Sequence, residues 1–365
     1  MHLGLPPLEV STRLPRLAAG LEESGCDALI VTNLENVRYL TGFTGSSAVL
    51  VVSPAVVLLV TDGRYQTQSA EQIAGAGVEV EIVIGNASAQ LEAIVGALAG
   101  SARVGLEAGN VTWATMRRYD DALDAELVPT RGVVEALRVV KDPGELARIE
   151  AACDVADAAL DSVKQRLLER PSEIEFAVEL EFAMRRLGAQ GTAFEIIVAS
   201  GPNSAMPHAR PTGRCVESGD VVVVDFGALV EGYRSDMTRT FSIGEPSAAH
   251  RELYEAVATA QRAGVAAVEA GATSGSVDLA ARESLTAAGY GGFFLHSTGH
   301  GVGLDIHEAP WVAAGAADIL VSGTIVTVEP GAYLAGDAGV RIEDTVVVTA
   351  SGCRPLTKST KDYIL

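Results

Sequence analysis

The stretch GDVVVVDFG, residues 219–227, decides the fold because the chain repeats it in altered form as GTIVTVEPG, residues 323–331. In both copies an acidic residue stands six positions after one glycine and two positions before another. A second pattern follows each copy: RSDMT at 234–238 and RIEDT at 341–345 share an arginine, an acid and a threonine at the same spacing. Two patterns that recur in the same order, about 105 residues apart, indicate an internal duplication around a pseudo-twofold axis.

The residues around these copies predict the same order of helices and strands twice. Pro143 stands at the start of a helical pattern, where proline is favoured, and Ser172-x-x-Glu175 has the spacing of a capping box. We expect helices at about 144–168, 172–188, 250–270 and 276–288, and strands at 194–200, 221–226, 239–243, 325–328 and 345–349. Residues 143–365 are therefore predicted to form one duplicated domain, with two helices ahead of antiparallel strands in each half.

The N-terminal residues 1–135 have a different pattern, in which apolar runs alternate with helical segments. This alternation is typical of an α/β layer, and a chain of 365 residues has room for two domains at about 100–200 residues each. Residues 48–60 are the longest apolar stretch, but Ser53-Pro54 interrupts them and they are too short to cross a bilayer, so we expect a hairpin. The predicted strands are 28–31, 48–52, 56–60, 78–84 and 104–106, and the predicted helices are 64–74, 87–99 and 112–123.

Composition excludes several classes of function. Lys and Arg number 27 against 47 Asp and Glu, a net charge of −20, which argues against binding to nucleic acid or to an anionic membrane. With 48% hydrophobic residues the chain is not disordered. The N-terminal sequence has no basic segment followed by an apolar run, so we expect no signal peptide and a cytoplasmic location. The four widely spaced cysteines are expected to be buried, reduced thiols: Cys26, Cys153, Cys215 and Cys353.

Four acidic residues in the two copies are the candidate metal ligands. Asp225 follows four valines, and a carboxylate in such an apolar run must be paired, hydrated or protonated. Taken alone, it could end its strand facing solvent or pair with an arginine. The duplication, however, brings Asp225 and Asp236 close to Glu329 and Glu343, and four neighbouring carboxylates need cations. Two divalent metal ions satisfy both their charge and their geometry.

Three histidines fall within HSTGHGVGLDIH, residues 296–307, and supply the remaining ligand. They are His296, His300 and His307, and their density indicates a site rather than a solitary core histidine. Gly299, Gly301 and Gly303 surround His300, and we expect them to allow close approach of a ligand to the backbone. Four carboxylates and one imidazole suit Mn²⁺ or Co²⁺, with Zn²⁺ as a third candidate.

The motifs resemble a known family. DFGALVEGYRSDMTRTF (225–241), HSTGHGVGLDIHEAP (296–310), TVEPGAY (327–333) and VRIEDTV (340–346) resemble the pita-bread metallopeptidases, which include methionine aminopeptidase, Xaa-Pro aminopeptidase, prolidase and creatinase. TDGRYQTQSAEQ (61–72) is similar to the creatinase-type N-terminal domain of the proline-specific branch. The resemblance implies an α/β (α+β) chain with a creatinase-like α/β domain at 1–135 and a pita-bread catalytic domain at 143–365.

The resemblance also implies roles for the metal ligands. Asp225 would chelate one metal ion, and Asp236 and Glu343 would bridge the two. His300 and Glu329 would complete the coordination of the second ion. Water held by both ions would be the nucleophile, with Glu329 also acting as its general base.

Further roles follow from the resemblance for residues beside the metals. His307 would contact the substrate carbonyl and assist proton transfer. His208, in GPNSAMPHARPT (201–212), and His296 match active-site histidines of the proline-specific branch. Arg341 would hold a ligand carboxylate in place.

One departure from the family bears on the substrate. Many archaeal-type prolidases have an arginine directly after the HE-x-P stretch, where this chain has Trp311. Another cation would then have to read the carboxylate of a dipeptide, and the candidates are Arg210 and, from a partner subunit's N-terminal domain, Arg64 or Arg38. The resemblance favours an Xaa-Pro dipeptidase, commonly a homodimer, acting on small peptides with proline in second position. The alternatives are an Xaa-Pro aminopeptidase, a creatinase-like hydrolase and a non-catalytic binding module.

Overall fold

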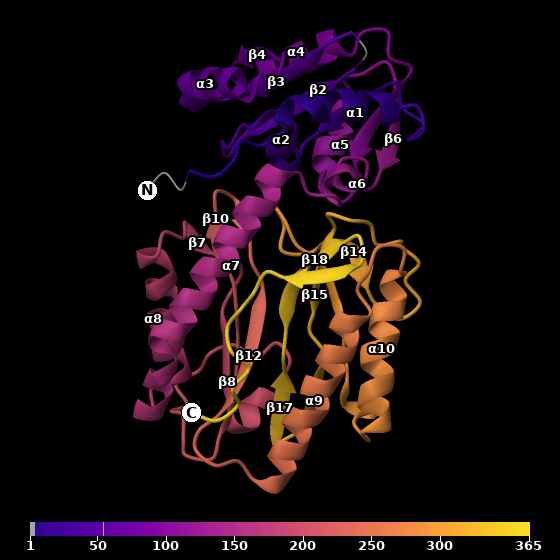
Figure 1. Ribbon diagram of the computed structural model, residues 1–365. Helices are drawn as coiled ribbons and strands as arrows, with labels where there is room; N and C mark the ends of the chain where they lie inside the picture. The colour runs from indigo at the N-terminus through magenta and orange to yellow at the C-terminus, as the bar shows by residue number, and fades with distance from the viewer. Residues whose placement is uncertain (1–3, 54) are drawn as a thin grey trace. The chain divides into compact units, whose positions relative to one another are not determined.

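The computed structural model describes residues 4–53 and 55–365, which divide into two compact units (Figure 1). The N-terminal unit comprises Pro7–Arg138, and the C-terminal unit comprises Val139–Leu365 together with residues 4–6. Among the described residues, no helix combines the length and the apolar character that a membrane span requires.

The N-terminal unit contains a six-stranded mixed sheet in the order β4-β3-β2-β1-β5-β6. Its strands are β1 Ala28–Val31, β2 Ala48–Val52, β3 Val57–Thr61, β4 Glu81–Ile84, β5 Arg103–Glu107 and β6 Glu126–Thr130. Its helices are α1 Arg13–Gly20, α2 Leu34–Thr41, α3 Gln66–Ala76, α4 Ala87–Ala97, α5 Trp113–Asp120 and α6 Glu135–Arg138. The predicted hairpin is confirmed, since β2 and β3 pair antiparallel from Ala48 opposite Thr61 to Val52 opposite Val57; Pro54 itself lies outside the described residues.

Four of these elements escaped sequence analysis, among them the four-residue α6. α1 and α2 have eight residues each, too few for a helical period to stand out, although Asn33 caps α2 by accepting from the amides of Glu35 and Asn36. β6 contains Pro129, which argues against a central strand, but β6 lies at the edge of the sheet, where a missing amide hydrogen is tolerated.

The C-terminal unit opens with two capped helices, as predicted. In α7 (Pro143–Val163) the Asp142 carboxylate accepts from the Glu145 amide at 2.9 Å, while the Glu145 carboxylate accepts from the Asp142 amide at 3.0 Å. The final turn predicted for α7 is instead a 3₁₀ segment, Lys164–Glu169. α8 (Glu173–Arg186) begins with the predicted capping box of Ser172 and Glu175. The second half supplies α9 (Ala248–Ala266) and α10 (Ser274–Ala287).

The strands of the C-terminal unit confirm the duplication. In the first half β9 lies between β12 and β8, and in the second half β15 lies between β18 and β13, all antiparallel. A hairpin, β10–β11 or β16–β17, follows each central strand. The strands are β7 Gly191–Thr192, β8 Ile197–Ser200, β9 Val221–Phe226, β10 Ala228–Val230, β11 Tyr233–Arg234, β12 Met237–Ser242, β13 Gly299–Gly301, β14 Glu308–Val312, β15 Ile325–Val328, β16 Gly331–Leu334, β17 Ala338–Arg341, β18 Asp344–Thr349 and β19 Gly352–Pro355.

Alternation along the two central strands decides which way the acids point. Val222 and Val224 of β9 pack in the core formed with α7 and α8, so Asp225 projects from the opposite face. Val326 and Val328 of β15 likewise pack in a core with Val277 of α10. The apolar faces of both sheets are thus covered, and the polar faces are left for the site.

The cysteines only partly match the prediction. Cys26 and Cys153 are buried, whereas Cys215 is exposed and Cys353 is partly exposed. Cys215 follows Arg214 on a surface segment whose amides and carbonyls bond to Pro171 and Glu173, so its side chain is turned outward. The expectation of burial was wrong for Cys215 because composition cannot reveal which face of an irregular segment is covered.

Candidate active site

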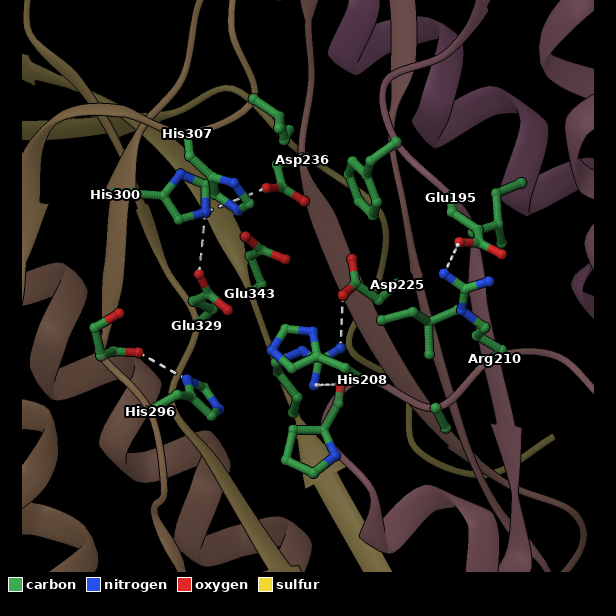
Figure 2. A pocket seen from close by; sticks show the side chains of 18 of the residues that line it. Glu195, His208, Arg210, Asp225, Asp236, His296, His300, His307, Glu329 and Glu343 are labelled. Carbon is green, nitrogen blue, oxygen red and sulfur yellow. Dashed lines mark hydrogen bonds and ion pairs between the residues drawn. The ribbon is translucent and has the colours of Figure 1, made fainter. Parts of the chain in front are cut away.

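The four predicted acidic ligands lie together on the polar faces of the two half-sheets (Figure 2). Asp225 belongs to β9 and Glu329 follows β15, while Asp236 and Glu343 lie just before β12 and β18. Carboxylate oxygens of Asp225, Asp236 and Glu343 all lie within 4.8 Å of one another, a spacing suited to a shared metal ion.

His300, on β13, lies next to this cluster. Its Nε2 is 3.3 Å from Oε1 of Glu329 and 3.6 Å from Oδ2 of Asp236. Its Nδ1 is 3.0 Å from the carbonyl oxygen of Gly301, which accepts the ring proton and leaves Nε2 free to bind a metal. The structure therefore brings all five predicted ligands together.

The glycines around His300 are required by the close packing of neighbouring groups. A Cβ on Gly299 would lie 2.0 Å from the Thr327 carbonyl oxygen, and one on Gly301 would lie 2.3 Å from that of Ala309. A Cβ on Gly303 would meet the Glu308 carboxylate. These glycines allow neighbouring strands and a side chain to approach, and the expected close approach of a ligand to this backbone stays a prediction.

The electrostatics of the cluster favour a cation. Burial, reinforced by the neighbouring carboxylates, raises the pKa of both Asp236 and Glu343 well above the ordinary range. Burial is the largest single effect on Glu329 and opposes its ionisation, but His300, His296 and Arg341 together outweigh it and lower the pKa of Glu329. Oδ1 of Asp225 and Oε1 of Glu343 are buried without a hydrogen-bond partner among the described residues. Buried oxygens of this kind fit hard divalent ions.

Arg341 holds one of the acids, as the resemblance implied. Its guanidinium donates to Oδ2 of Asp225 at 2.6 Å and to the Tyr333 hydroxyl at 2.8 Å, and its Nε donates to Oγ1 of Thr238 at 3.2 Å. The Thr238 hydroxyl in turn donates to Oε2 of Glu343 at 2.8 Å. One buried cation thus orients acids from both halves.

Sequence analysis did not assign roles to Thr238, Thr345 or Tyr333. The repeated patterns contained the signal for the threonines: Thr238 bonds to the side chain of Glu343, and Thr345 donates to the carbonyl of Asp236 at 2.7 Å. Each threonine therefore supports the acid of the opposite half.

His296 and His307 both line the cavity beside the cluster, in different environments. Nε2 of His296 lies 2.8 Å from the Tyr333 hydroxyl and Nδ1 lies 2.7 Å from the Ser297 carbonyl. Burial lowers the pKa of His296. The ring of His307 meets that of His300 edge-on at 4.4 Å, and burial together with the His300 charge lowers the pKa of His307. Both imidazoles are thus neutral bases near neutral pH.

The cluster opens into a cavity of about 560 Å³ within the C-terminal unit. His208 is exposed on its wall, and Trp311 of β14 stacks beside His307 with ring centroids 6.3 Å apart. The apolar lining comprises Phe194, Ile196, Ile197, Pro207, Ile306 and Trp311. A small apolar side chain can therefore be placed next to the carboxylates.

The three candidate arginines are placed differently. Arg210 lines the cavity, and its guanidinium lies 3.1 Å from the Glu195 carboxylate, with both side chains mostly exposed (Figure 2). Arg64 belongs to the N-terminal unit, where it makes two hydrogen bonds to Asp62, at 2.9 and 2.8 Å. Arg38 lies on α2 of the same unit and is partly buried. Of the three, Arg210 alone lines this cavity.

A duplicated antiparallel unit with four carboxylates and one imidazole on its polar faces defines the pita-bread class of metallohydrolases. The model of metallopeptidase family M24 matches residues 147–350, and that of the creatinase/prolidase N-terminal domain matches residues 13–140. The chain belongs to metallopeptidase family M24.

Several relatives and structural neighbours match over nearly the whole length of both chains. An Xaa-Pro dipeptidase of Pyrococcus furiosus is 34% identical over 355 residues, covering 96% of this chain and 99% of the relative. The structure of an Xaa-Pro dipeptidase from Bacillus anthracis is similar with a TM-score of 0.93 and 40% identity, covering 98% and 100%. That of an X-Pro aminopeptidase from Thermotoga maritima is similar with a TM-score of 0.85 and 36% identity, covering 94% and 99%.

Proposed function

We propose that this protein is a two-metal Xaa-Pro dipeptidase, which hydrolyses dipeptides that have proline in the second position. One observation carries the proposal: the buried cluster of four carboxylates and His300 forms one wall of a small, partly apolar cavity. The full-length likeness to Xaa-Pro dipeptidases supports it.

The resemblance to the pita-bread metallopeptidases implies which residues would hold the ions. Asp225, Asp236 and Glu343, together with His300 and Glu329, would supply the ligands of two divalent ions. Carboxylates with one imidazole favour Mn²⁺ or Co²⁺, with Zn²⁺ as a third candidate. When bound, such ions lower the pKa of water and polarise a scissile carbonyl. Arg341 stabilises this arrangement because it holds Asp225 at 2.6 Å.

The remaining side chains supply proton transfer and orientation. Glu329, whose pKa is lowered, is ionised at neutral pH and accepts the proton of the attacking water. The leaving nitrogen of the cleaved bond must gain a proton, and Glu329 can pass on the proton that it accepted from the water. His307, a neutral imidazole beside His300, contacts the substrate carbonyl and assists this transfer. His208 and His296 line the same cavity on the substrate side.

The apolar lining suits a proline ring. Phe194, Ile197, Ile306 and Trp311 all line the cavity that contains the carboxylates. Arg210 is the side chain best placed to read the free carboxylate of a dipeptide, since Trp311 carries no charge. An Xaa-Pro aminopeptidase is the second candidate, favoured by Trp311 and by the similarity to the Thermotoga maritima enzyme.

Peptide length separates the two candidates. Metal-loaded protein should be assayed with Xaa-Pro dipeptides, Xaa-Pro-Xaa tripeptides and Xaa-Ala dipeptides as controls. A dipeptidase cleaves the first far better than the other two. Equal cleavage of the tripeptides would establish an aminopeptidase, and failure to cleave any proline peptide while metal is bound would refute the proposal.

Two further expectations belong to this proposal. Four free thiols fit a reducing cytoplasm as the place of action. We also propose a homodimer, with Arg64 or Arg38 of a partner subunit as the alternative reader of the substrate carboxylate; sedimentation or light scattering would test the assembly.

A further inference from the structure

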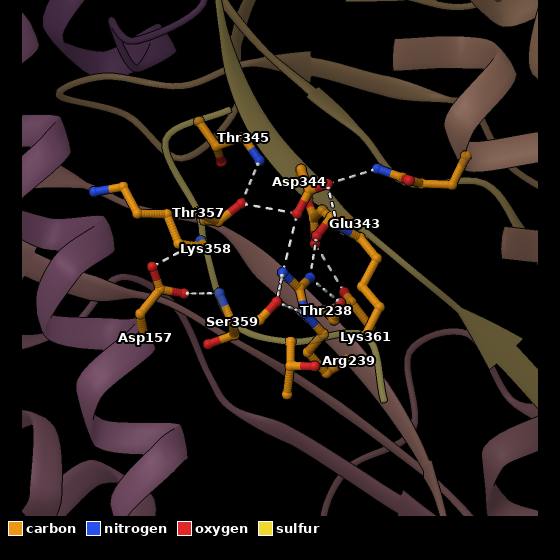
Figure 3. Close-up of polar contacts among 12 residues, drawn as sticks. Asp157, Thr238, Arg239, Glu343, Asp344, Thr345, Thr357, Lys358, Ser359 and Lys361 are labelled. Carbon is orange, nitrogen blue, oxygen red and sulfur yellow. Dashed lines mark hydrogen bonds and ion pairs between the residues drawn. The ribbon is translucent and has the colours of Figure 1, made fainter. Parts of the chain in front are cut away.

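A buried ion pair lies beside the proposed bridging ligand Glu343 (Figure 3). Arg239 of β12 donates to Oδ1 of Asp344 at 3.0 Å, and the two side chains are only 2% and 4% exposed. Neither residue lines the cavity that contains the cluster. The pair is therefore outside the chemistry described above, and its position next to Glu343 requires another explanation.

Arg239 holds the backbone at two residues whose side chains bond to each other. Its Nη1 donates to the carbonyl of Thr238 at 2.9 Å and to the carbonyl of Glu343 at 2.5 Å. The Thr238 hydroxyl donates to Oε2 of Glu343 at 2.8 Å. With the backbone and one carboxylate oxygen both held, Oε1 of Glu343 has a single well-defined direction.

The C-terminal segment 357–361 completes this arrangement with alternate residues (Figure 3). The Ser359 carbonyl accepts from Arg239 at 2.8 and 3.0 Å, and the Thr357 hydroxyl donates to Asp344 at 3.1 Å. Nζ of Lys361 lies 2.7 Å from Oδ2 of Asp344, which also accepts from Gln261 of α9 at 2.8 Å. All four hydrogen-bonding groups converge on the Arg239–Asp344 pair.

A second anchor fixes the segment itself. The carboxylate of Asp157, on α7, accepts from the backbone amides of Lys358 at 2.7 Å and of Ser359 at 2.8 Å. The segment is thus held between α7 on one side and the Arg239–Asp344 pair on the other. Displacing it would remove partners from both buried charges.

The duplication provides an internal comparison. When the patterns at 234–238 and 341–345 are aligned, Met237 occupies the position equivalent to Asp344. One residue beyond the pattern, Arg239 occupies the position equivalent to Val346. Met237 and Val346 are fully buried and apolar. The same scaffold is therefore built without an ion pair in the equivalent position. Since a buried ion pair is weak evidence for stability, the fold by itself does not account for Arg239 and Asp344.

We propose that Arg239 and Asp344, together with Thr357, Ser359 and Lys361 of the C-terminal segment, are positioning residues that orient Glu343 for metal binding. This inference rests on the proposed role of Glu343 as a ligand. It predicts that loosening the segment weakens metal affinity, although the segment touches neither the cavity nor the other ligands.

Two lysines of the segment provide a matched test. Lys361→Met removes the contact with Asp344, whereas Lys358→Met removes an exposed lysine that pairs with Asp154 at 2.7 Å. Both remove one positive charge, which on electrostatic grounds alone would strengthen binding of a cation. If the segment orients Glu343, Lys361→Met should weaken binding of the cation, whereas Lys358→Met should not.

The experiment is a calorimetric titration of the metal-free full-length protein and of each variant with Mn²⁺. We expect Lys361→Met to raise the Kd about threefold, and Asp344→Asn to raise it roughly 10–100-fold, the range for partners of metal ligands. Lys358→Met should stay within about twofold of the wild type. Melting of the metal-free variants checks that each one folds.

The outcomes separate this inference from the proposed function. If the wild type binds Mn²⁺ and Lys361→Met binds it as tightly as Lys358→Met, or more tightly, the positioning role is wrong while the metal site stands. If the wild type binds no divalent ion, the proposed function fails and this inference fails with it.

Discussion

Replacement of Arg210 by alanine should abolish the preference of the site for substrates with a free C-terminal carboxylate. The described residues that line the cavity include two arginines, Arg210 and Arg341. Arg341 is buried and already bound to Asp225, Tyr333 and Thr238. Arg210 is bound only to the exposed carboxylate of Glu195 at 3.1 Å, which a substrate carboxylate can displace.

The exposure of this pair limits the size of the effect. Arg210 and Glu195 side chains are 79% and 62% exposed, so water screens their attraction, and a pair of this kind contributes up to about 1 kcal/mol. A substrate carboxylate bound against the apolar wall is less hydrated, and a hydrogen bond to a charged group contributes about 1.5–3 kcal/mol. We expect the contact between Arg210 and the substrate carboxylate to contribute near the lower end of that range. About 1.4 kcal/mol corresponds to a tenfold change in KM.

The assay compares an Xaa-Pro dipeptide with its C-terminal amide. Wild-type protein should show a KM about tenfold higher for the amide. Arg210→Ala should raise KM for the free acid by the same factor and leave the amide unchanged, whereas Glu195→Gln should lower KM for the free acid by releasing Arg210. Equal cleavage of acid and amide by the wild type would refute carboxylate reading. If Arg64→Ala or Arg38→Ala causes the loss instead, the cation comes from the N-terminal unit and the assignment to Arg210 is wrong.

Three other predictions follow from the cluster. Chelation should abolish activity, and added Mn²⁺ or Co²⁺ should restore it. Asp236→Asn and Glu343→Gln should each lower kcat by orders of magnitude. Full activity in metal-free samples would contradict both the metal dependence and the role of these two acids. His307→Ala should retain metal by elemental analysis but lower kcat roughly 10²–10⁴-fold, and loss of metal would make it a ligand. Because burial raises the pKa of Asp236 and Glu343, protons compete with metal. Mn²⁺ affinity should therefore rise with pH through those raised values. The metal-free protein should lose stability over the same range, since ionising buried acids is costly, and melting with and without Mn²⁺ at successive pH values would test this.

The sequence was sufficient to predict that the four acids lie together because it contains the duplication. Asp225 with Glu329, and Asp236 with Glu343, stand at equivalent positions of two copies, so a pseudo-twofold axis must bring them together. The run of four valines before Asp225 does not say which side of β9 carries the acid; the packing of Val222 and Val224 in the core decides that. Fold class and family followed from the same residues.

The sequence did not determine the partners of these acids. Arg341 and Arg234 occupy equivalent positions, yet Arg341 holds Asp225 whereas Arg234 donates to the Ala193 carbonyl. Which carboxylate a guanidinium reaches depends on packing between the two halves, and a pattern within one half contains no information about that packing. The same limit applies to Glu195, which neutralises part of the charge of Arg210 across the cavity wall.

The C-terminal segment is the clearest case of what only tertiary structure decides. Residues 357–361 carry no motif, and their composition is typical of an exposed, polar end. Folding brings Thr357, Ser359 and Lys361 to Arg239 and Asp344, more than a hundred residues from Arg239 in the chain. Local periodicity reports the burial of a segment against its own sheet, whereas contacts between distant segments arise from the closure of the whole domain, which no local pattern encodes.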